Sequence, residues 1–345
     1  MWTDNASQID MLFYKPYAEI VSNVAIETDR DPLTIGVFGL WGAGKSTLLN
    51  LISQNYKDKN GIICVTINAW MFESYEDAKI AIMEALLREL EEAVPSKVVK
   101  KKFRSLLKKI DFLKVGTQLV STAAPIIASA ASGTPIPLLI NIPQNAKEIG
   151  STIKNISDSV QDVKDKYIKD DEAATDSVVN NVRKFRKEFQ SALEDEEIKR
   201  VVVLLDDLDR CQPDRIIETL EAVKLFLSVD KSTFIVAADE NVIQYAIKRK
   251  YPKIDNFNIE LDKEYIEKII QIPIQIPELS SKDIQNYLLL LVMQKYLKSE
   301  IFENLILKIE EKKLTIGENV ISFEQIKEII SDDTNCYKDG MKSEC

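Results

Sequence analysis

The chain has 345 residues, 45% of them hydrophobic and 29% charged, with a formal net charge of -10. This length suits two compact units or one large domain with an insert, and the acidic balance excludes non-specific nucleic-acid binding by the chain as a whole. The sequence contains no histidine, which excludes Ser-His-Asp and Cys-His nucleophilic systems and any imidazole metal site.

The cysteines and the first residues of the chain indicate its cellular compartment. The four cysteines are scattered and form no C-x-x-C pair, which favours a reducing compartment over a disulfide or zinc framework. The opening residues, MWTDNASQID, have no basic region before an apolar core, so they do not resemble a signal peptide. We expect a cytoplasmic protein.

Short apolar runs alternate with helical patterns along the chain. Strands are predicted over 33–38, 62–67, 201–205 and 233–238, with a fifth over 271–277 whose prolines require an edge or terminal position. Helices are predicted from Lys45 to about Gln54, from Asp77 to about Ala93, and after Pro213. The fold class is therefore α/β: a parallel sheet of about five strands covered by helices on both faces.

The second and third strands are too far apart in sequence for one crossover, which predicts a helical insert. Residues 97–114 are rich in lysine, and Phe103, Leu106, Leu107, Ile110 and Leu113 share one helical face. Residues 115–146 carry no charge, and a short heptad seam runs from Ile149 to Tyr167. Four parts are expected: 1–94 and 196–280 as the two halves of the core, 95–195 as the insert, and 281–345 as a C-terminal helical region.

The stretch GLWGAGKST fits the phosphate-binding pattern G-x-x-x-x-G-K-[ST], and it lies between a predicted strand and a predicted helix. Its glycines let successive backbone N–H groups point at phosphate oxygens, and the helix adds its positive dipole end. Lys45 is expected to reach the β and γ phosphates, and the Ser46 hydroxyl to ligate Mg²⁺. The predicted phosphate-binding residues are Gly39, Trp41, Gly42, Ala43, Gly44, Lys45, Ser46 and Thr47.

A second motif, VVVLLDDLDR, is an apolar strand that ends in acidic residues. Asp206, at the strand tip, is expected to hold Mg²⁺, and Asp207 to polarise the water that attacks the γ-phosphate. The alternative for Asp207 and for Asp209 is a solvated acidic turn that caps the next helix. No N-K-x-D guanine motif is present, so ATP is the expected nucleotide.

A third element, FIVAADENVI, places Asp239 just after a strand. This side chain is a candidate to reach the γ-phosphate or the attacking water, and in this class of ATPases its strand lies between the other two. The alternative is an N-cap that starts the next helix. Arg210 and Arg215 are candidates to neutralise transition-state charge, with surface ion pairs as the commoner role. Trp41 is expected to be a packing residue.

At this point the chain resembles the KAP family of P-loop ATPases. The resemblance rests on GVFGLWGAGKSTLL, VTINAWMFES, VVVLLDDLDRCQPDRIIETLEAVKLFL, FIVAADENVIQYAI and YIEKIIQIPIQIP, which occur in that order over about residues 10 to 280. It implies phosphate binding by Gly39 to Thr47, a Mg²⁺ site at Ser46 and Asp206, and hydrolysis supported by Asp207. It assigns no role to Asn68 and Trp70 of the Asn-Ala-Trp signature. The longer helical region typical of the family has no clear counterpart before Cys345.

The insert raises the question of membrane contact, because family members often carry a membrane-spanning insert. Both flanking strands belong to one sheet, so the insert crosses a membrane an even number of times or not at all. Residues 115–146 are short for two spans, and a re-entrant or soluble hairpin fits better. The basic helix favours contact of residues 97–146 with an anionic membrane surface, at the inner face. The alternative is a solvated basic face on an ordinary helix.

The sequence thus predicts a Mg-dependent ATP-hydrolysing switch that passes its conformational change to protein partners or to a second copy. Family resemblance suggests the ATPase component of a bacterial anti-phage defence system. The alternative function is a nucleotide-gated, membrane-associated signalling scaffold with little hydrolysis. A P-loop kinase for a small acceptor is a further alternative, against which the acidic pair argues. No clear nucleic-acid site is present.

Overall fold

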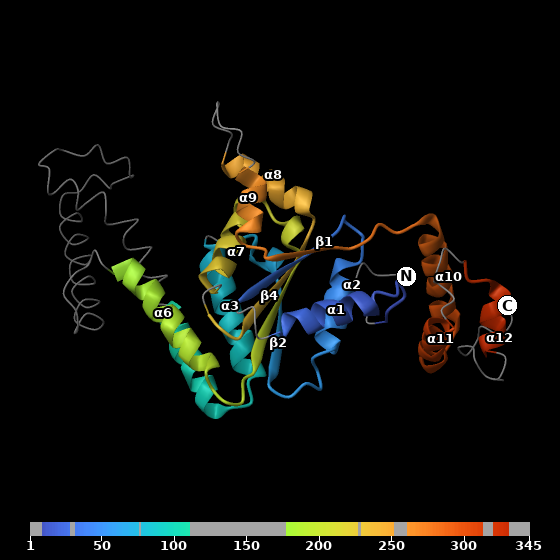
Figure 1. Ribbon diagram of the computed structural model, residues 1–345, viewed down its shortest axis with the longest axis horizontal. Coiled ribbons are helices and arrows are strands. Elements are labelled where there is room, and N and C mark those ends of the chain that lie inside the picture. The colour runs from blue at the N-terminus through green and yellow to red at the C-terminus, as the bar shows by residue number, and fades with distance from the viewer. Residues whose placement is uncertain are drawn as a thin grey trace, which may run out of the picture. The chain divides into compact units, whose positions relative to one another are not determined.

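A computed structural model of the chain describes residues 9–27, 32–75, 77–110, 177–226, 229–251, 261–312 and 320–330. The chain forms two compact units, one from residues 1–108 and 188–345 and the other from residues 109–187. The first unit contains the sheet and the helices that cover it (Figure 1). The predicted heptad seam and the uncharged segment 115–146 lie outside the described residues.

Five parallel strands form one sheet in the order β2-β3-β4-β1-β5. Their bounds are β1 Leu33–Phe38, β2 Ile62–Asn68, β3 Arg200–Asp206, β4 Ser232–Ala238 and β5 Ile272–Gln275. The parallel sheet is confirmed, as is the position of β4 between the strand before the P-loop and the strand that ends in aspartate. Because all strands are parallel, their carboxyl ends meet at one edge, where ligands bind in such folds.

The burial of each strand follows its place in the sheet. Every residue of β1 and β4 is buried, and β3 is buried up to its last residue, as expected for central strands with helices on both faces. In β2 buried residues alternate with partly or fully exposed ones, and in β5 partly exposed residues alternate with exposed ones. Pro273 lies in β5, and an edge strand tolerates proline because one side of its backbone forms no ladder.

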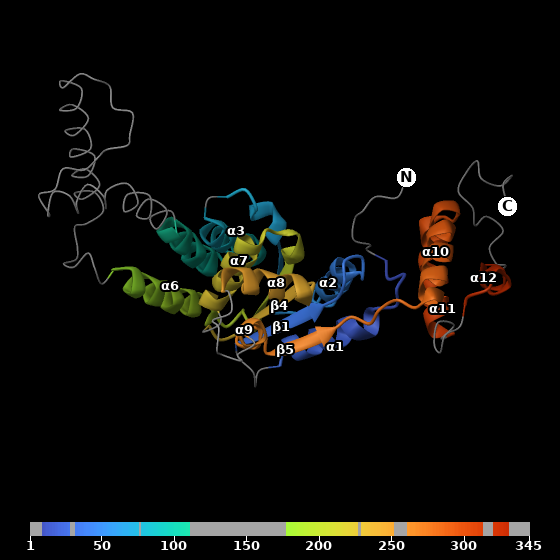
Figure 2. The same ribbon diagram turned by 90° about the horizontal axis from the view of Figure 1, so that it is seen from above.

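Helices cover both faces of the sheet, as Figures 1 and 2 show from two directions. On one face, α1 and α2 pack together and, with the sheet, form a cluster around Ile35, Val37 and Ile52. On the other face, α3 packs on β2 and on α7, and α7 packs on α8. The bounds are α1 Lys15–Ala25, α2 Lys45–Gln54, α3 Ala78–Ala93, α6 Ser177–Leu193, α7 Pro213–Phe226, α8 Glu240–Lys250 and α9 Leu261–Glu267.

The C-terminal helices form a second apolar cluster within the first unit. They are α10 Ser281–Tyr296, α11 Ser299–Glu311 and α12 Phe323–Ile330. Leu290, Phe302 and Ile326 are buried in this cluster, together with Met11 from the N-terminal segment. Helix α10 begins with a capping box, in which Ser280 accepts from the Asp283 N–H and Asp283 accepts from the Ser280 N–H.

The basic helix of the insert spans residues 97–110 as described, and its apolar face is packed against protein. Phe103 is 0% exposed, and its ring centroid lies 6.0 Å from that of Phe189 in α6. Leu106 is also buried, and Lys102 Nζ donates to the Ser191 carbonyl at 2.7 Å. The expectation that this face enters a membrane interface is therefore wrong for these residues, because other side chains already cover it. No described helix is long and apolar enough to cross a membrane.

This packing predicts a stability difference between two positions of one helix. Phe103→Ala should lower the free energy of unfolding by about 3–5 kcal/mol, the usual cost of emptying a buried phenylalanine site. Val98→Ala is the matched control, because Val98 is 62% exposed and should change it by less than about 0.5 kcal/mol. Denaturant titration of both variants measures the difference. Equal unfolding midpoints for the two variants would show that the helix face with Phe103 does not pack against protein.

Candidate nucleotide site

The phosphate-binding loop joins β1 to α2 at the carboxyl edge of the sheet. Gly42 and Gly44 have positive φ angles of 81° and 79°, which L-residues with a side chain rarely adopt. At Gly44 space is also limiting, since an added Cβ would lie 2.8 Å from Leu12 Cδ1 and 2.9 Å from Tyr14 Cε2. The Gly39 N–H donates to the Ala238 carbonyl at 3.3 Å, which ties the start of the loop to β4.

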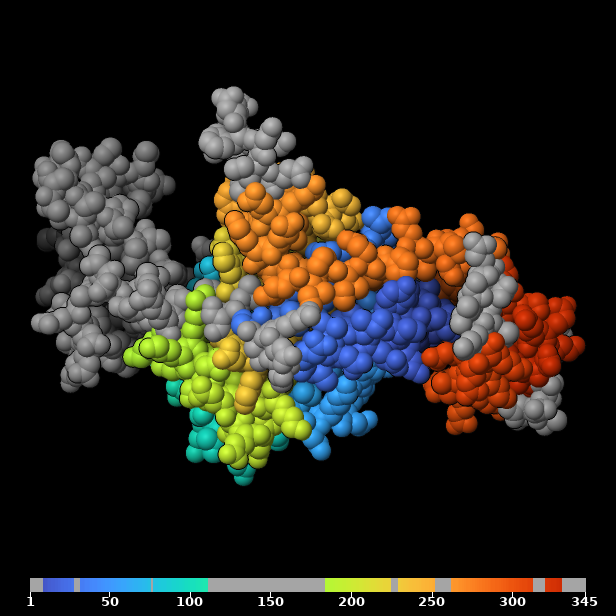
Figure 3. Space-filling model, viewed as in Figure 1, coloured from blue at the N-terminus to red at the C-terminus, as the bar shows by residue number. Residues whose placement is uncertain are grey.

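The N-terminal segment packs directly against this loop. The Tyr14 hydroxyl donates to the Ala43 carbonyl at 2.9 Å. Burial raises the pKa of Tyr14 to about 12, and the nearby carboxylates of Asp283 and Asp10 add to this shift, so the phenol stays protonated and keeps donating at neutral pH. Sequence reasoning missed Tyr14, because no motif marks a tyrosine 25 residues before the loop. The segment after β5, orange in Figure 3, lies beside the blue N-terminal residues, and both line a cavity of about 440 Å³.

Lys45 is the first residue of α2, and its ammonium group points back into the loop. Lys45 Nζ lies 2.9 Å from Asp209 Oδ2 and donates to the carbonyls of Gly39 at 3.0 Å and Leu40 at 3.1 Å. The two charged side chains are only 8% and 7% exposed. Asp209 also accepts from the Asp239 backbone N–H at 3.0 Å. Asp209 is thus a buried partner of the loop lysine, and a role as a solvated acidic turn is wrong.

Asp206 ends β3 beside Ser46. The Ser46 hydroxyl donates to the Asp206 carboxylate, and the Asp207 N–H donates to Asp206 Oδ1 at 2.9 Å. Burial raises the pKa of Asp206, with the charges of Asp207 and Asp209 adding to the shift, while these hydrogen bonds oppose it. A divalent cation would offset the burial and the repulsion. A hydroxyl and a buried carboxylate in contact are oxygen donors that fit Mg²⁺.

Asp207 has a different set of partners. Its Oδ2 accepts from Asn68 Nδ2 at 2.8 Å, and its Oδ1 lies 2.7 Å from Arg210 Nε. Its φ angle is 55°, in the left-handed region that costs a residue with a side chain about 1–2 kcal/mol. Asn68 comes from β2, and the Asn-Ala-Trp stretch was the sequence signal that could have found it.

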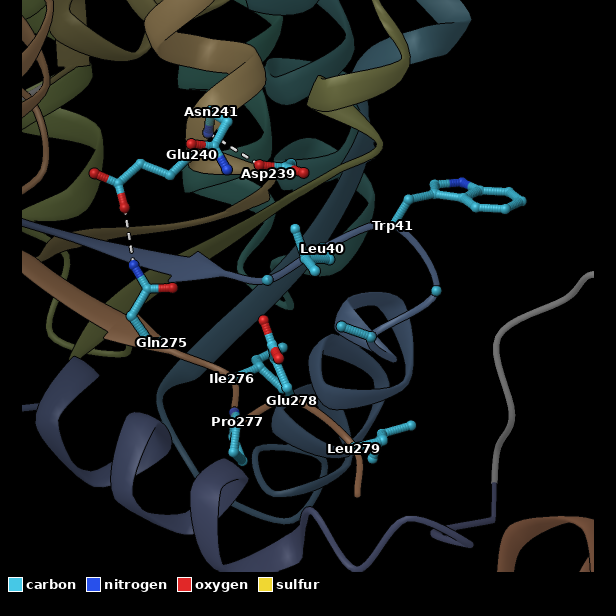
Figure 4. A pocket seen from close by; sticks show the side chains of 13 residues that line it. Leu40, Trp41, Asp239, Glu240, Asn241, Gln275, Ile276, Pro277, Glu278 and Leu279 are labelled. Atoms are coloured by element: carbon cyan, nitrogen blue, oxygen red, sulfur yellow. Dashed lines mark hydrogen bonds between the residues drawn. The ribbon is translucent and has the colours of Figure 1, made fainter. Parts of the chain in front are cut away.

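Asp239 follows β4 and caps α8. Its carboxylate accepts from the Asn241 N–H at 2.9 Å, which is the N-cap alternative considered from sequence. The same residue lines a cavity of about 590 Å³, together with the outer side of the phosphate loop and the segment after β5 (Figure 4). Glu240 in this cavity accepts from Gln275 Nε2 at 2.8 Å, which links α8 to β5.

Trp41 lies differently from its expected role, whereas Arg210 and Arg215 form ion pairs, the commoner role considered from sequence. Trp41 is 75% exposed, and in Figure 4 its ring points away from the other labelled side chains. The expected packing role for Trp41 is therefore wrong. Arg215 pairs with Glu218 at 2.6 Å, and Arg210 pairs with Asp207, so both arginines form ion pairs within this chain.

The structure brings most of the predicted site residues to one cavity of about 230 Å³. Its lining includes Gly42, Gly44, Lys45, Ser46, Thr47, Asp206, Asp207, Asp209 and Arg210. Gly39, Ala43 and Asp239 line the neighbouring, larger cavity instead. Trp41 and Gly42 belong to both. The arrangement places one ammonium, one guanidinium and three carboxylates around a small space at the end of the phosphate loop.

Known proteins resemble parts of this chain. The phage T7 exclusion protein of Escherichia coli (strain K12) is 27% identical over 277 residues, which are 76% of this chain and 34% of that protein. The chain thus spans about a third of the length of that relative. An uncharacterised protein of Methanocaldococcus jannaschii is 28% identical over 180 residues, which are 50% of this chain and 88% of that protein.

Among solved structures, the Aeropyrum pernix ORC2 protein, in ADPNP-ADP complexes, matches 94% of this chain and 69% of its own at 13% identity. The TM-score is 0.34, too low to support an argument about the site.

A family model also matches most of the chain. The model described as the KAP family P-loop domain matches residues 11–335, which include the N-terminal segment on the loop, the whole sheet and the three C-terminal helices. The glycine-rich loop between β1 and α2, the aspartates at the end of β3 and this match lead to one conclusion: the chain belongs to the KAP family of P-loop domains.

Proposed function

We propose that the chain binds ATP with Mg²⁺ and hydrolyses it, and that the cycle switches its conformation. The observation that carries this proposal is the convergence of Lys45, Ser46, Asp206 and Asp207 on one cavity at the carboxyl edge of the sheet. Side chains from two separate motifs meet there, as transfer of a phosphoryl group requires.

The loop and Lys45 bind the phosphates of the nucleotide. The loop's backbone N–H groups and the N-terminus of α2 provide a positive environment for anions. The Lys45 ammonium group donates to two loop carbonyls and pairs with Asp209. A phosphate oxygen replaces the carbonyl contacts, while Asp209 keeps the ammonium group turned toward the loop. The lack of an N-K-x-D guanine motif supports ATP as the nucleotide.

Ser46 and Asp206 would hold Mg²⁺, which supplies charge neutralisation on the β and γ phosphates when bound. Asp207 orients and polarises the attacking water, because its carboxylate lines the same cavity one residue beyond Asp206. Asp239 is the candidate to contact the γ-phosphate or the water from β4, through its position beside Asp209. Arg210 is the described arginine in this cavity that can balance transition-state charge.

The biological setting is a proposal that rests on one relative. The phage T7 exclusion protein matches most of this chain but is about three times as long as the matched part. We propose that this chain serves as the ATPase component of an anti-phage system and acts on protein partners or on a second copy. No membrane contact is proposed for residues 97–110, since their apolar face is packed.

The first prediction about function concerns the loop lysine. Lys45→Met should weaken binding of a fluorescent ATP analogue by about 10- to 100-fold, the value of a hydrogen bond to a charged group. This change also leaves Asp209 buried without its cation, which lowers stability. The double variant Lys45→Met/Asp209→Asn removes that charge and should bind ATP as weakly as the single variant.

Lys79→Met is the matched control for this test, because Lys79 pairs with Glu221 away from the loop. It should bind the analogue as wild type does. Wild-type affinity in both Lys45 variants would remove the assignment of a phosphate-binding loop.

The second prediction separates hydrolysis from binding. Asp207→Asn should still bind Mg-ATP but release phosphate about 100-fold more slowly, the usual size of a lost general-base contribution. Asp206→Asn should also weaken the Mg²⁺-dependent part of binding. Phosphate release at saturating ATP, with binding measured in parallel, distinguishes the two variants.

Asp214→Asn controls for the loss of an exposed carboxylate nearby and should match wild type. A wild-type rate in Asp207→Asn would favour a nucleotide-gated scaffold with little hydrolysis over a hydrolysing switch.

The third prediction concerns phage defence. Bacteria that express the protein in its natural gene context should lower the plating efficiency of a sensitive phage, and Lys45→Met should reduce this protection because it weakens ATP binding. Immunoblotting checks that both forms accumulate equally. Full protection by Lys45→Met at equal abundance would separate the defence role from ATP binding.

A further inference from the structure

Asn68 is the last residue of β2 and lies beside Asp206, the last residue of β3. In the strand register Asn68 is opposite Asp206, so its side chain lies at the edge of the sheet where the site is formed. It opens the Asn-Ala-Trp stretch, for which the phosphate-binding and Mg²⁺-binding roles described above offer no explanation. The structure connects it instead to Asp207, through the 2.8 Å hydrogen bond from Nδ2 to Oδ2.

The orientation of the Asn68 amide is determined by its backbone surroundings. Its Oδ1 accepts from the Trp70 N–H at 3.0 Å and caps a 3₁₀ helix, η2, over Ala69–Phe72. Because a backbone N–H can only donate, this bond assigns the oxygen to the Trp70 side of the amide. The NH₂ group must then face Asp207.

The segment that carries this cap is anchored at its other end as well. Glu73 follows η2, and its two carboxylate oxygens lie 3.3 Å and 3.2 Å from the Gln212 backbone N, which donates to them at the start of α7. The residues after Asp207 and those after Asn68 are therefore connected to each other. The backbone around Asn68 is thus fixed on both sides, by β2 before it and by the contact between Glu73 and Gln212 after it. This fixed backbone holds the side-chain amide of Asn68 in place.

Asp207 is held at both carboxylate oxygens, by Asn68 on one and by Arg210 on the other. A carboxylate has about four acceptor positions, so two donors leave acceptor capacity for a water in the cavity. The backbone of Asp207 has an unfavourable left-handed φ of 55°, and strain of this kind concentrates at functional sites. Asn68 and Arg210 therefore determine the direction in which the remaining acceptor positions of Asp207 point.

We propose that Asn68 is a positioning residue for hydrolysis, whose side-chain NH₂ fixes the carboxylate of Asp207 in the direction needed to orient the attacking water. This proposal rests on the proposed role of Asp207. Asn68 acts through Asp207, and it is absent from the described lining of the cavity that contains Lys45 and Ser46. It therefore controls turnover and leaves nucleotide affinity unchanged.

The test is Asn68→Asp in the full chain. This isosteric change keeps an oxygen to accept from the Trp70 N–H, so η2 stays capped. It replaces the donor that faces Asp207 with a carboxylate oxygen, which repels Asp207. Phosphate release at saturating Mg-ATP should fall about 10- to 100-fold, as for a misplaced reacting group. Affinity for a fluorescent ATP analogue should stay within about twofold of wild type.

Asn55→Asp is the matched control, because Asn55 Nδ2 donates to Ser22 Oγ at 3.0 Å on α1, away from the site. It loses the same kind of donor and should keep the wild-type turnover. Thermal melting of both variants monitors the fold.

A double-mutant cycle tests whether Asn68 acts on turnover through Asp207. In an Asp207→Asn background, Asn68→Asp should cause no further loss of turnover, because the base that it positions is already gone. The swapped pair Asn68→Asp/Asp207→Asn again has one donor facing one acceptor, so it should melt closer to wild type than Asn68→Asp does, without recovering turnover.

The outcomes differ for the two proposals. Wild-type turnover in Asn68→Asp, an equal loss of affinity and turnover, or full additivity with Asp207→Asn overturns the positioning role and leaves the proposed function in place. Wild-type turnover in Asp207→Asn, or absence of phosphate release by the wild-type protein, overturns both.

Discussion

The buried ion pair between Lys45 and Asp209 is the interaction on which the site depends. Lys45 begins α2 after β1, Asp209 follows β3, and Asp209 also accepts from the backbone at the end of β4. One carboxylate therefore joins the ends of the three central strands. Removing either partner would leave an uncompensated buried charge, which typically costs 3–5 kcal/mol. The geometry of the phosphate loop and that of the acidic cluster are consequently coupled.

The three aspartates at and just after the end of β3 show how neighbouring identical residues acquire different tasks. Asp206 is in contact with Ser46, Asp207 with Asn68 and Arg210, and Asp209 with Lys45. The left-handed backbone at Asp207 turns the chain between them. Each carboxylate has its own hydrogen-bond donors, which oppose the repulsion among the three. This division supports a metal-binding role for the first and a role toward water for the second.

The basic helix at 97–110 illustrates a limit of amphipathic patterns. A periodic apolar stripe next to lysines describes a membrane-surface helix and a packed protein helix equally well, since both bury one face and solvate the other. The contact between Phe103 and Phe189 decides in favour of packing. Those two residues are far apart in sequence, so no local pattern contains the information.

Much of the fold could be predicted from local sequence. The five strands, the helix from Lys45 to Gln54 and the edge position of the proline-containing strand follow from apolar runs, glycine and proline, because these features act on the backbone residue by residue. The loop and Asp206 were marked by motifs whose spacing is tied to that backbone. The sequence by itself therefore determined the class of fold and marked the loop that is proposed to bind phosphates.

Only the tertiary structure decided which side chains meet. Asn68 contacts Asp207 across 139 positions, Tyr14 reaches the loop carbonyl of Ala43, and Trp41 points outward where packing was expected. Asp209, for which a solvated turn was one alternative, is a buried partner of Lys45 for the same reason. These contacts arise from the order β2-β3-β4-β1-β5, which brings distant strand ends together. Strand order is a property of the packed sheet, and periodicity within one strand carries no record of its neighbours.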